Sequence, residues 1–266
     1  MASTDPVVLN LPVTEAEVYA AIADVLDPEL DEPLVKLGFI DRVQVEGADV
    51  TITFRLPTYW CAPNFAYLMA SDLHASVSRL PGVGAVRVAL VDHFTEDEVT
   101  SGVNNCQSFM EAFPGEADGN LDELRLTFLR KGFLMRQEVL VRRMMKAGLD
   151  EAALIALCVA DLGIDEAADV ALVAHPGGTL RLEKLGQKAR AYLRRGVELG
   201  LLQAPDDPLI VDTDGRPIPA GGLTEFLRRS RSIRFNIAFN TNICTGLYRA
   251  RYGGSAPVVV EEGASE

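Results

Sequence analysis

The sequence predicts an α/β (α+β) protein: a small α-β-β-α-β module with two helices on a three-stranded sheet, followed by a mainly α-helical second domain. Helical and strand patterns alternate in that order over residues 14–91. The charge also changes along the chain, because residues 1–120 hold 19 of the 38 Asp and Glu but only 5 of the 25 Lys and Arg. We therefore expect domains at 1–115 and 121–252, and a flexible acidic tail at 253–266.

The module is expected to begin with a helix. Thr14 and Glu17 have capping-box spacing, in which a hydroxyl is followed three residues later by a glutamate. Pro28 cannot continue that helix, and Pro33 keeps the acidic segment after it irregular.

Next comes a β-hairpin pattern, with strands at 39–45 and 50–56. Pro63 then stands where helices tolerate proline, and apolar residues recur at helical spacing up to Leu80. A third strand is expected at 85–91.

The remaining residues predict helices with less regular sequence between them. Residues 92–120 show no strong periodicity, and 233–252 fits either a strand or a helix. The helices are expected at 121–147, 150–162, 180–199 and 223–231.

Composition narrows the class of protein. The chain is 48% apolar and 24% charged, with no apolar stretch long enough to span a membrane and no signal-peptide pattern at its start. Its four cysteines are scattered and do not suggest a disulfide framework. We expect a cytoplasmic protein with no membrane and no nucleic acid as partners, since phosphate binding needs local positive charge.

Cys61 is the most informative single residue. It stands in a short strand-to-helix turn, Pro57-Thr58-Tyr59-Trp60-Cys61-Ala62-Pro63. The first turn of a helix offers unpaired N–H groups and the positive end of the helix dipole, and both favour a thiolate that can bind metals or electrophiles. The alternative is a small buried hydrophobic residue at a tight turn.

An acidic segment follows the first helix and is expected near the same end of the module. It reads Asp27-Pro28-Glu29-Leu30-Asp31-Glu32, with four carboxylates in six residues. Carboxylates beside a thiolate favour a shared cation. The alternative is a solvated loop, which we expect for Asp31 and Glu32, and a loop-fixing hydrogen bond is the alternative for Asp27.

Four pieces of sequence resemble the SufT/PaaD-like iron–sulfur assembly domain, and the resemblance covers residues 15–101. The pieces are Ile22–Leu30, which ends in Asp-Pro-Glu; the leucine-glycine segment Val35–Ile40; Thr58-Tyr59-Trp60-Cys61 followed by Pro63; and Leu80-Pro81-Gly82-Val83. The resemblance implies a non-enzymatic factor for iron–sulfur cluster assembly or metal-centre maturation, with a cluster or iron bound transiently. It maps the family cysteine onto Cys61 and the family acid onto Asp27, with Glu29 and Thr58 in supporting positions.

The resemblance also implies a client metalloprotein. The PaaD branch is associated with a multicomponent diiron oxygenase, so maturation of a monooxygenase is one specific form of this function. The chain departs from the family pattern in three places: Trp60 replaces a small residue, Ala62 precedes the proline, and Asp92-His93-Phe94-Thr95 stands where the family has Asp-Pro-Pro-Trp.

One thiolate cannot hold a cluster alone, because iron–sulfur centres usually take four ligands. His93, Cys106 and Cys244 are further candidate metal ligands. Their alternatives are a solvated loop histidine and incidental cysteines in asparagine-rich turns. A partner, or a second protomer in a homodimer, would supply what the chain lacks. Cys158 lies in an apolar stretch and is expected to pack in a core.

Two competing functions remain open. In a thiol-dependent enzyme, Cys61 would be the nucleophile, His93 its base, and Asp92 or Asp27 would orient the base. In a docking protein for an oxygenase, the basic helix 125–146 would bind the client, although such a helix can equally pack on its own domain.

Overall fold

The computed structural model describes residues 13–115 and 121–253 and forms two compact units. The described part of the second unit runs from 122 to 239. All other described residues belong to the first unit, including 240–253 at the end of the last helix. The predicted boundaries place residues 240–252 in the second domain instead. The tail expected at 253–266 lies, from residue 254 on, outside the described residues.

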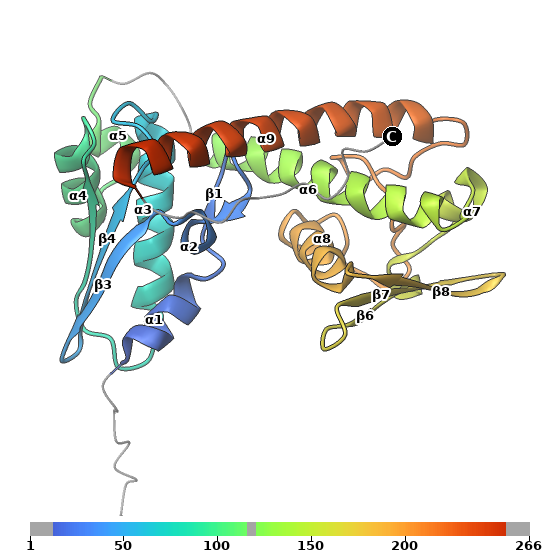
Figure 1. The fold of residues 1–266 in the computed structure, drawn as a ribbon, viewed down its shortest axis with the longest axis horizontal. Helices are drawn as coiled ribbons and strands as arrows, with labels where there is room; N and C mark the ends of the chain where they lie inside the picture. The colour runs from blue at the N-terminus through green and yellow to red at the C-terminus, as the bar shows by residue number, and fades with distance from the viewer. Residues whose placement is uncertain (1–12, 116–120, 254–266) are drawn as a thin grey trace, which may run out of the picture. The chain divides into compact units, whose positions relative to one another are not determined.

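The first unit is built around a three-stranded sheet (Figure 1). Strands β3 and β4 are antiparallel, and β5 pairs with β4 in parallel, which gives the order β3-β4-β5. The elements are α1 (Glu15–Ile22), β1 (Leu26–Asp27), β2 (Glu32–Pro33), α2 (Leu34–Leu37), β3 (Ile40–Glu46), β4 (Asp49–Arg55), α3 (Pro63–Ser78), β5 (Val86–Val91), α4 (Glu96–Asn104) and α5 (Phe109–Ala112). The predicted α-β-β-α-β order is confirmed.

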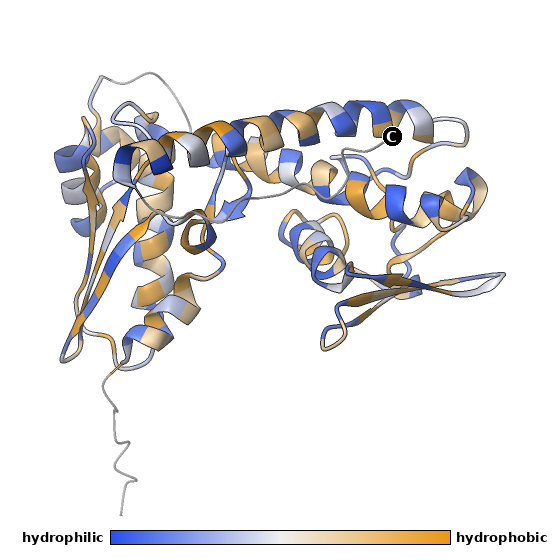
Figure 2. Ribbon diagram, viewed as in Figure 1, coloured by the Kyte–Doolittle hydropathy of each residue, from blue (hydrophilic) through white to orange (hydrophobic). Residues whose placement is uncertain are grey.

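Local sequence explains these elements. The Thr14 hydroxyl accepts a hydrogen bond from Glu17 N at 3.3 Å, and Glu17 accepts one from Thr14 N at 2.8 Å, so the predicted capping box starts α1. Gly47 has φ +65° between β3 and β4, a conformation that glycine adopts without strain. Apolar residues lie along α3 and along the strands (Figure 2). Phe54 and Leu73 are fully buried in the core that these elements form.

Residues 92–120, which show no strong periodicity in the sequence, contain α4 and α5. Helix α4 has three acidic residues in its first turn, and α5 begins with a capping box at Ser108. The helices are too short to give a strong periodic signal, so the acidic first turn of α4 and the capping box of α5 were the features that could have identified them.

The second unit combines helices with an antiparallel sheet of order β6-β7-β8. The elements are α6 (Leu121–Lys146), α7 (Glu151–Ile155), the 3₁₀ turn η1 (Val159–Asp161), β6 (Leu162–Asp165), β7 (Val170–His175), β8 (Gly178–Glu183), α8 (Gly186–Glu198) and α9 (Leu223–Tyr252). None of the helices in the described part of the chain is both long and apolar enough to cross a membrane.

Three helix predictions for this half were wrong in extent. The helix expected at 150–162 ends early, and the one expected at 180–199 is strand β8 followed by α8. Gly186 is the first residue of α8 and lies close to the backbone of β7. A Cβ at this position would lie 2.7 Å from the backbone nitrogen of Val170, so the close approach requires glycine. The helix expected at 223–231 continues through 233–252 as one helix, α9.

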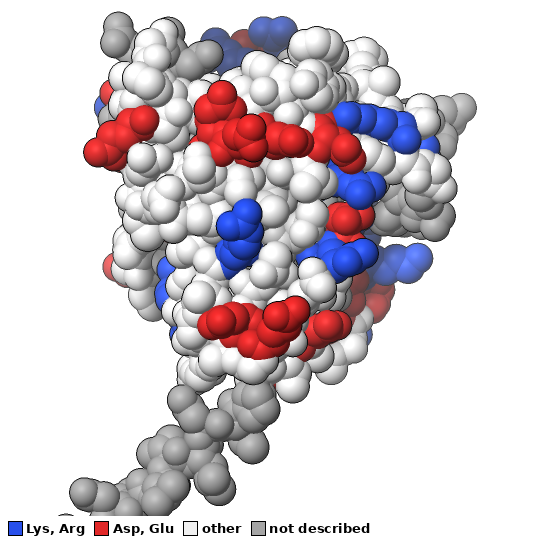
Figure 3. Space-filling view, turned by 90° about the vertical axis from the view of Figure 1, so that its left-hand side faces the viewer, with Lys and Arg blue, Asp and Glu red and all other residues white. Residues whose placement is uncertain are grey.

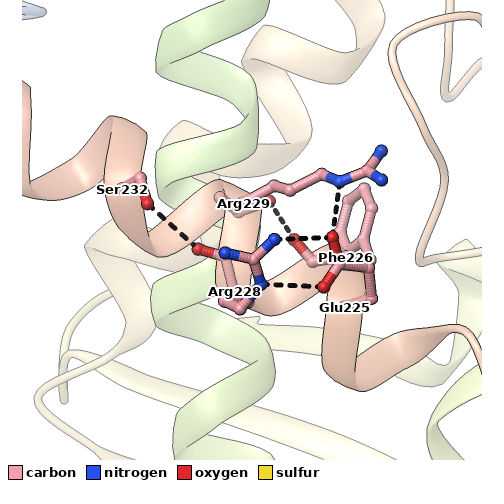
Figure 4. Close-up of polar contacts among 6 residues, drawn as sticks. Glu225, Phe226, Arg228, Arg229 and Ser232 are labelled. Atoms are coloured by element: carbon pink, nitrogen blue, oxygen red, sulfur yellow. Dashed lines mark hydrogen bonds and ion pairs between the residues drawn. The ribbon is translucent and has the colours of Figure 1, made fainter.

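Helices α6 and α9 carry charged side chains that are largely paired within the second unit. Glu225, in the first turn of α9, accepts hydrogen bonds from Arg228 and Arg229 (Figure 4), and these lower its pKa to about 2. On α6 the buried Glu138 pairs with Arg234 at 2.9 Å. The apolar side of α6 packs into the core of its own unit.

The last turns of α9 complete the core of the first unit. The Tyr248 ring stacks on Phe39, with ring centroids 5.3 Å apart, and only 7% of Tyr248 is exposed. One turn later, the Arg55 guanidinium lies over the Tyr252 ring, 5.2 Å from its centroid. Two aromatic contacts therefore hold the last turns of α9 against the rest of the first unit.

We expect Tyr248→Ala to destabilise the first unit by about 3 kcal/mol, since it removes a buried aromatic side chain and leaves a cavity beside Phe39. Hydrogen exchange of the β4 amides measures this loss in the first unit alone. As a control, Tyr19→Ala changes a more exposed tyrosine on α1 and should cost less than about 0.5 kcal/mol. Equal protection of the β4 amides in Tyr248→Ala and wild type would contradict the packing described.

Candidate functional site

Cys61 lies in the connection between β4 and α3, and its side chain is half-buried. Ala62 is the N-cap of α3 and Pro63 is its first residue. The thiol therefore comes just before the helix rather than within its first turn. The side chain of the preceding residue, Trp60, is 74% exposed to solvent.

Thr58 contacts the sulfur directly. Its Oγ1 lies 3.3 Å from Cys61 Sγ and accepts a hydrogen bond from Trp60 N at 3.2 Å. The hydroxyl has one proton and a second lone pair left, so it can donate to a Cys61 thiolate or accept from a Cys61 thiol. The threonine-x-x-cysteine spacing thus forms a turn in which the threonine hydroxyl lies beside the cysteine sulfur.

His93 fixes the same turn from the loop after β5. Its Nε2 donates to the Cys61 carbonyl oxygen at 2.9 Å, while Nδ1 accepts from Thr95 N at 3.2 Å and lies 3.0 Å from Thr95 Oγ1. Burial lowers the pKa of His93, so the ring is neutral. His93 is 2% exposed, which corrects the expectation of a solvated loop histidine.

This geometry bears on the two roles considered for His93. Both ring nitrogens bond within the protein, and a metal ion would have to displace one of those bonds. The nitrogen nearest Cys61 bonds to its carbonyl oxygen. The described contacts therefore make His93 a positioning residue for the Cys61 turn.

Asp27 ends β1 and holds the acidic loop together. Its Oδ1 accepts hydrogen bonds from Glu29 N and Leu30 N, both at 2.9 Å. Burial raises the pKa of Asp27 to about 6, although these two bonds favour the charged form. Asp31 lies in the same loop with φ +53° and is 5% exposed, so the expectation that it is solvated was wrong.

The end of α9 adds a second sulfur to this part of the first unit. Burial, and then the charges of Asp27, Cys61 and Glu29, raise the pKa of Cys244 to about 12. One turn earlier, Asn240 Nδ2 donates to Glu29 Oε1 at 3.2 Å. Cys61 and Cys244 both pack against the core of the first unit. Cys244 therefore lies in the same part of the first unit as Cys61 and the acidic loop, within reach of their charges.

The other two cysteines lie in different surroundings. Cys106 is exposed in the turn after α4, with φ +53°. Cys158 belongs to the second unit, and its thiol donates to Asp161 Oδ2 at 3.1 Å. Within residues 13–115 and 121–253, no group of three or more His, Cys, Asp or Glu side chains is arranged to hold a metal ion.

Sequence reasoning missed two supporting residues. Thr95 holds the His93 ring and Asn240 holds Glu29. The Asp-His-Phe-Thr segment gave a weak signal for Thr95, whereas Asn240 could not be found, because only the folded chain brings it to the acidic loop.

Chemically, the site offers one half-buried thiol, Cys61, beside the Thr58 hydroxyl, and a second thiol, Cys244. A thiol with a pKa of about 12 is protonated at neutral pH and becomes a ligand only when a cation replaces the proton. Two sulfurs suit iron, zinc or an iron–sulfur cluster, whereas magnesium and calcium prefer oxygen ligands.

Comparison with known proteins gives one match. Residues 15–89 match the family described as iron-sulfur cluster assembly protein. This supports the expected family for the N-terminal domain and a general role in iron–sulfur cluster assembly. The match includes Asp27, Thr58 and Cys61 and leaves the second unit and the end of α9 unmatched. Neither the curated proteins nor the solved structures contain a match to the chain.

We expect the stability of the protein to depend on pH through Asp27. Its folded-state pKa of about 6 lies above the ordinary 3.8, so the unfolded chain releases this proton first as the pH rises. The contribution of protonated Asp27 to the free energy of unfolding is fully present below pH 3.8. It is lost as the pH rises past about 6, a loss on the order of 3 kcal/mol. Asp27→Asn keeps the oxygen acceptor and removes the charge. Its free energy of unfolding relative to wild type should therefore rise between pH 4 and 7.

Chemical denaturation of both proteins across this pH range measures that difference. Asp24→Asn, which removes an exposed carboxylate after α1, controls for the loss of one negative charge from the unit. A difference for Asp27→Asn that does not change with pH would mean that burial does not raise the pKa of Asp27 in the folded protein.

Proposed function

We propose that this protein receives an iron–sulfur cluster or iron as cargo at Cys61 and passes it to a client metalloprotein. Cys61 is the principal ligand or transfer thiol, Asp27 is the supporting acid, and Cys244 is a second sulfur ligand. The match of residues 15–89 to the iron-sulfur cluster assembly family supports the general role.

The observation that carries the proposal is that Cys61 and Cys244 both pack against the core of the first unit. One sulfur lies in the matched domain and the other on α9, where Asn240, one turn before Cys244, bonds to Glu29 of the acidic loop. The charge of Cys61 is also among the causes that raise the pKa of Cys244. The neighbouring Asp27 and Glu29 add negative charge, which favours a bound cation.

The incomplete ligand set supports transient rather than permanent binding. Two thiols leave a cluster short of the four ligands that such centres usually take. Sulfide, a client cysteine or a second protomer would supply the others, and a client that contributes its own thiolates would draw the cluster away from this protein.

The contacts of His93 favour a carrier over a thiol-dependent enzyme. A general base would bond to the sulfur of its nucleophile. Here the His93 ring bonds to the carbonyl oxygen of Cys61, and Thr58 is the residue whose side chain lies beside the sulfur.

We also propose that the client is a subunit of a multicomponent diiron oxygenase. This step relies on the resemblance of residues 15–101 to the SufT/PaaD-like domain, whose PaaD branch is associated with such an oxygenase. Copurification with tagged oxygenase subunits tests it, and a client of a different metalloprotein class would replace it without affecting cargo binding at Cys61.

The direct test is anaerobic reconstitution with ferrous iron and sulfide, followed by absorbance and iron analysis. Wild-type protein should bind iron and develop the sulfur-to-iron absorption of a cluster. Cys61→Ser should lose most of it, and Cys244→Ser should bind less iron and lose it faster to a chelator. Cys158→Ser and Cys106→Ser, the matched controls, should behave as wild type. Equal loading of wild type and Cys61→Ser would refute the proposal.

A further inference from the structure

Beside the thiol, the first unit exposes three large rings, which we call the aromatic patch: Tyr59, Trp60 and Phe94. Their exposed fractions are 43%, 74% and 43%. Trp60 and Tyr59 meet edge to face at 4.9 Å between centroids, and Phe94 lies 6.1 Å from Trp60 and 6.2 Å from Tyr59. Exposed apolar side chains are common singly, but three in mutual contact form a surface that a partner can cover.

The aromatic patch is held rigidly at the Cys61 turn. Phe94 N donates to the Tyr59 carbonyl oxygen at 3.2 Å, which ties the two loops together. The His93 ring, 5.0 Å from Phe94, bonds to the carbonyl oxygen of Cys61. A molecule that covers these rings would therefore be placed beside the thiol.

The surroundings of the aromatic patch are acidic. Glu96, Asp97 and Glu98 form the first turn of α4, directly after Phe94, and all three are exposed. In the described part of the chain, Asp97 and Glu98 have no ion pair. On the side of the first unit that carries α4, Asp and Glu side chains gather in bands (Figure 3).

Two arginines lie near Asp92, just before the patch. Arg55 lies 3.4 Å from Asp92 and 3.5 Å from Asp41, and Arg251 donates to the Asp92 carbonyl oxygen at 2.7 Å, a contact that leaves its charge in place. The carboxylates of Glu96, Asp97 and Glu98 outnumber that charge, so the surface beside the patch stays acidic. A second copy of this chain would bring the same acidic turn to the same surface, and like charges oppose such pairing.

From these observations we infer that the aromatic patch and the acidic turn of α4 bind a basic, arginine-containing segment of the client. A guanidinium stacks on the face of Trp or Tyr, and exposed carboxylates beside the rings attract it over longer distances. The inference rests on the proposed function for the identity of the partner as a client. It assigns the Trp60 departure from the family pattern a role in partner binding.

Trp60 is the only tryptophan in the chain, so its fluorescence reports from the aromatic patch itself. The probes are two short synthetic peptides of equal length, one alternating Arg and Leu and the other alternating Glu and Leu. Full-length protein is titrated with each peptide without iron. The Arg peptide should shift the Trp60 emission saturably, and the Glu peptide should not.

Variants locate the binding through the anisotropy of a labelled Arg peptide. Trp60→Ser and the double change Asp97→Asn with Glu98→Gln should each weaken binding about five- to tenfold, and added salt should weaken it further. The matched control, Glu15→Gln with Glu46→Gln, removes two exposed charges elsewhere on the first unit and should change binding less than about twofold.

Three results would overturn the inference: equal binding of both peptides, unchanged binding in Trp60→Ser or in the α4 double variant, or self-association that Trp60→Ser abolishes. The last result would identify a second copy as the occupant. Because these titrations need no cluster, their failure leaves iron loading at Cys61 intact, and a failure of iron loading leaves the peptide result standing.

Discussion

The packing of Tyr248 on Phe39 is the contact on which the candidate site depends. It holds the last turns of α9 against the first unit, and those turns carry Cys244 and Asn240. The burial that positions Cys244 also disfavours its thiolate, which is why its pKa rises to about 12. Without this contact, the last turns of α9 would not hold Cys244 in the first unit. Cys61 would then lack Cys244 as a second sulfur ligand.

Polar side chains around the thiols are used mainly to shape the loops. Asp27 accepts two backbone N–H groups, and His93 joins the Cys61 carbonyl to the loop after β5. Because these groups are occupied by backbone partners, the sulfurs are the donors best suited to a soft cargo. Positioning and binding are thus divided between different residues of one small unit, and the aromatic patch adds a surface for a partner at the same turn.

Sequence reasoning succeeded where local chemistry decides the structure. The capping box at Thr14, the hairpin and the proline at the start of α3 were all readable, and the family resemblance of the N-terminal domain agrees with the match of residues 15–89. It failed where tertiary contacts decide. Short strands β6–β8 have little periodicity, and Phe235-Asn236-Ile237-Ala238-Phe239 fits a strand as well as a helix until packing selects α9. The location of Cys244 and Cys61 at one core could be proposed only as one of several ligand sets, because no local signal joins residues so far apart.

The most direct test of the central claim is to count sulfur ligands around a bound metal ion. The full chain is loaded anaerobically with one equivalent of ferrous iron, and X-ray absorption at the iron edge gives the number of iron–sulfur bonds. Two sulfur ligands in wild type, and one in Cys244→Ser as well as in Cys61→Ser, would agree with a shared site. An iron environment of oxygen and nitrogen alone, or the same sulfur count in all three proteins, would contradict it.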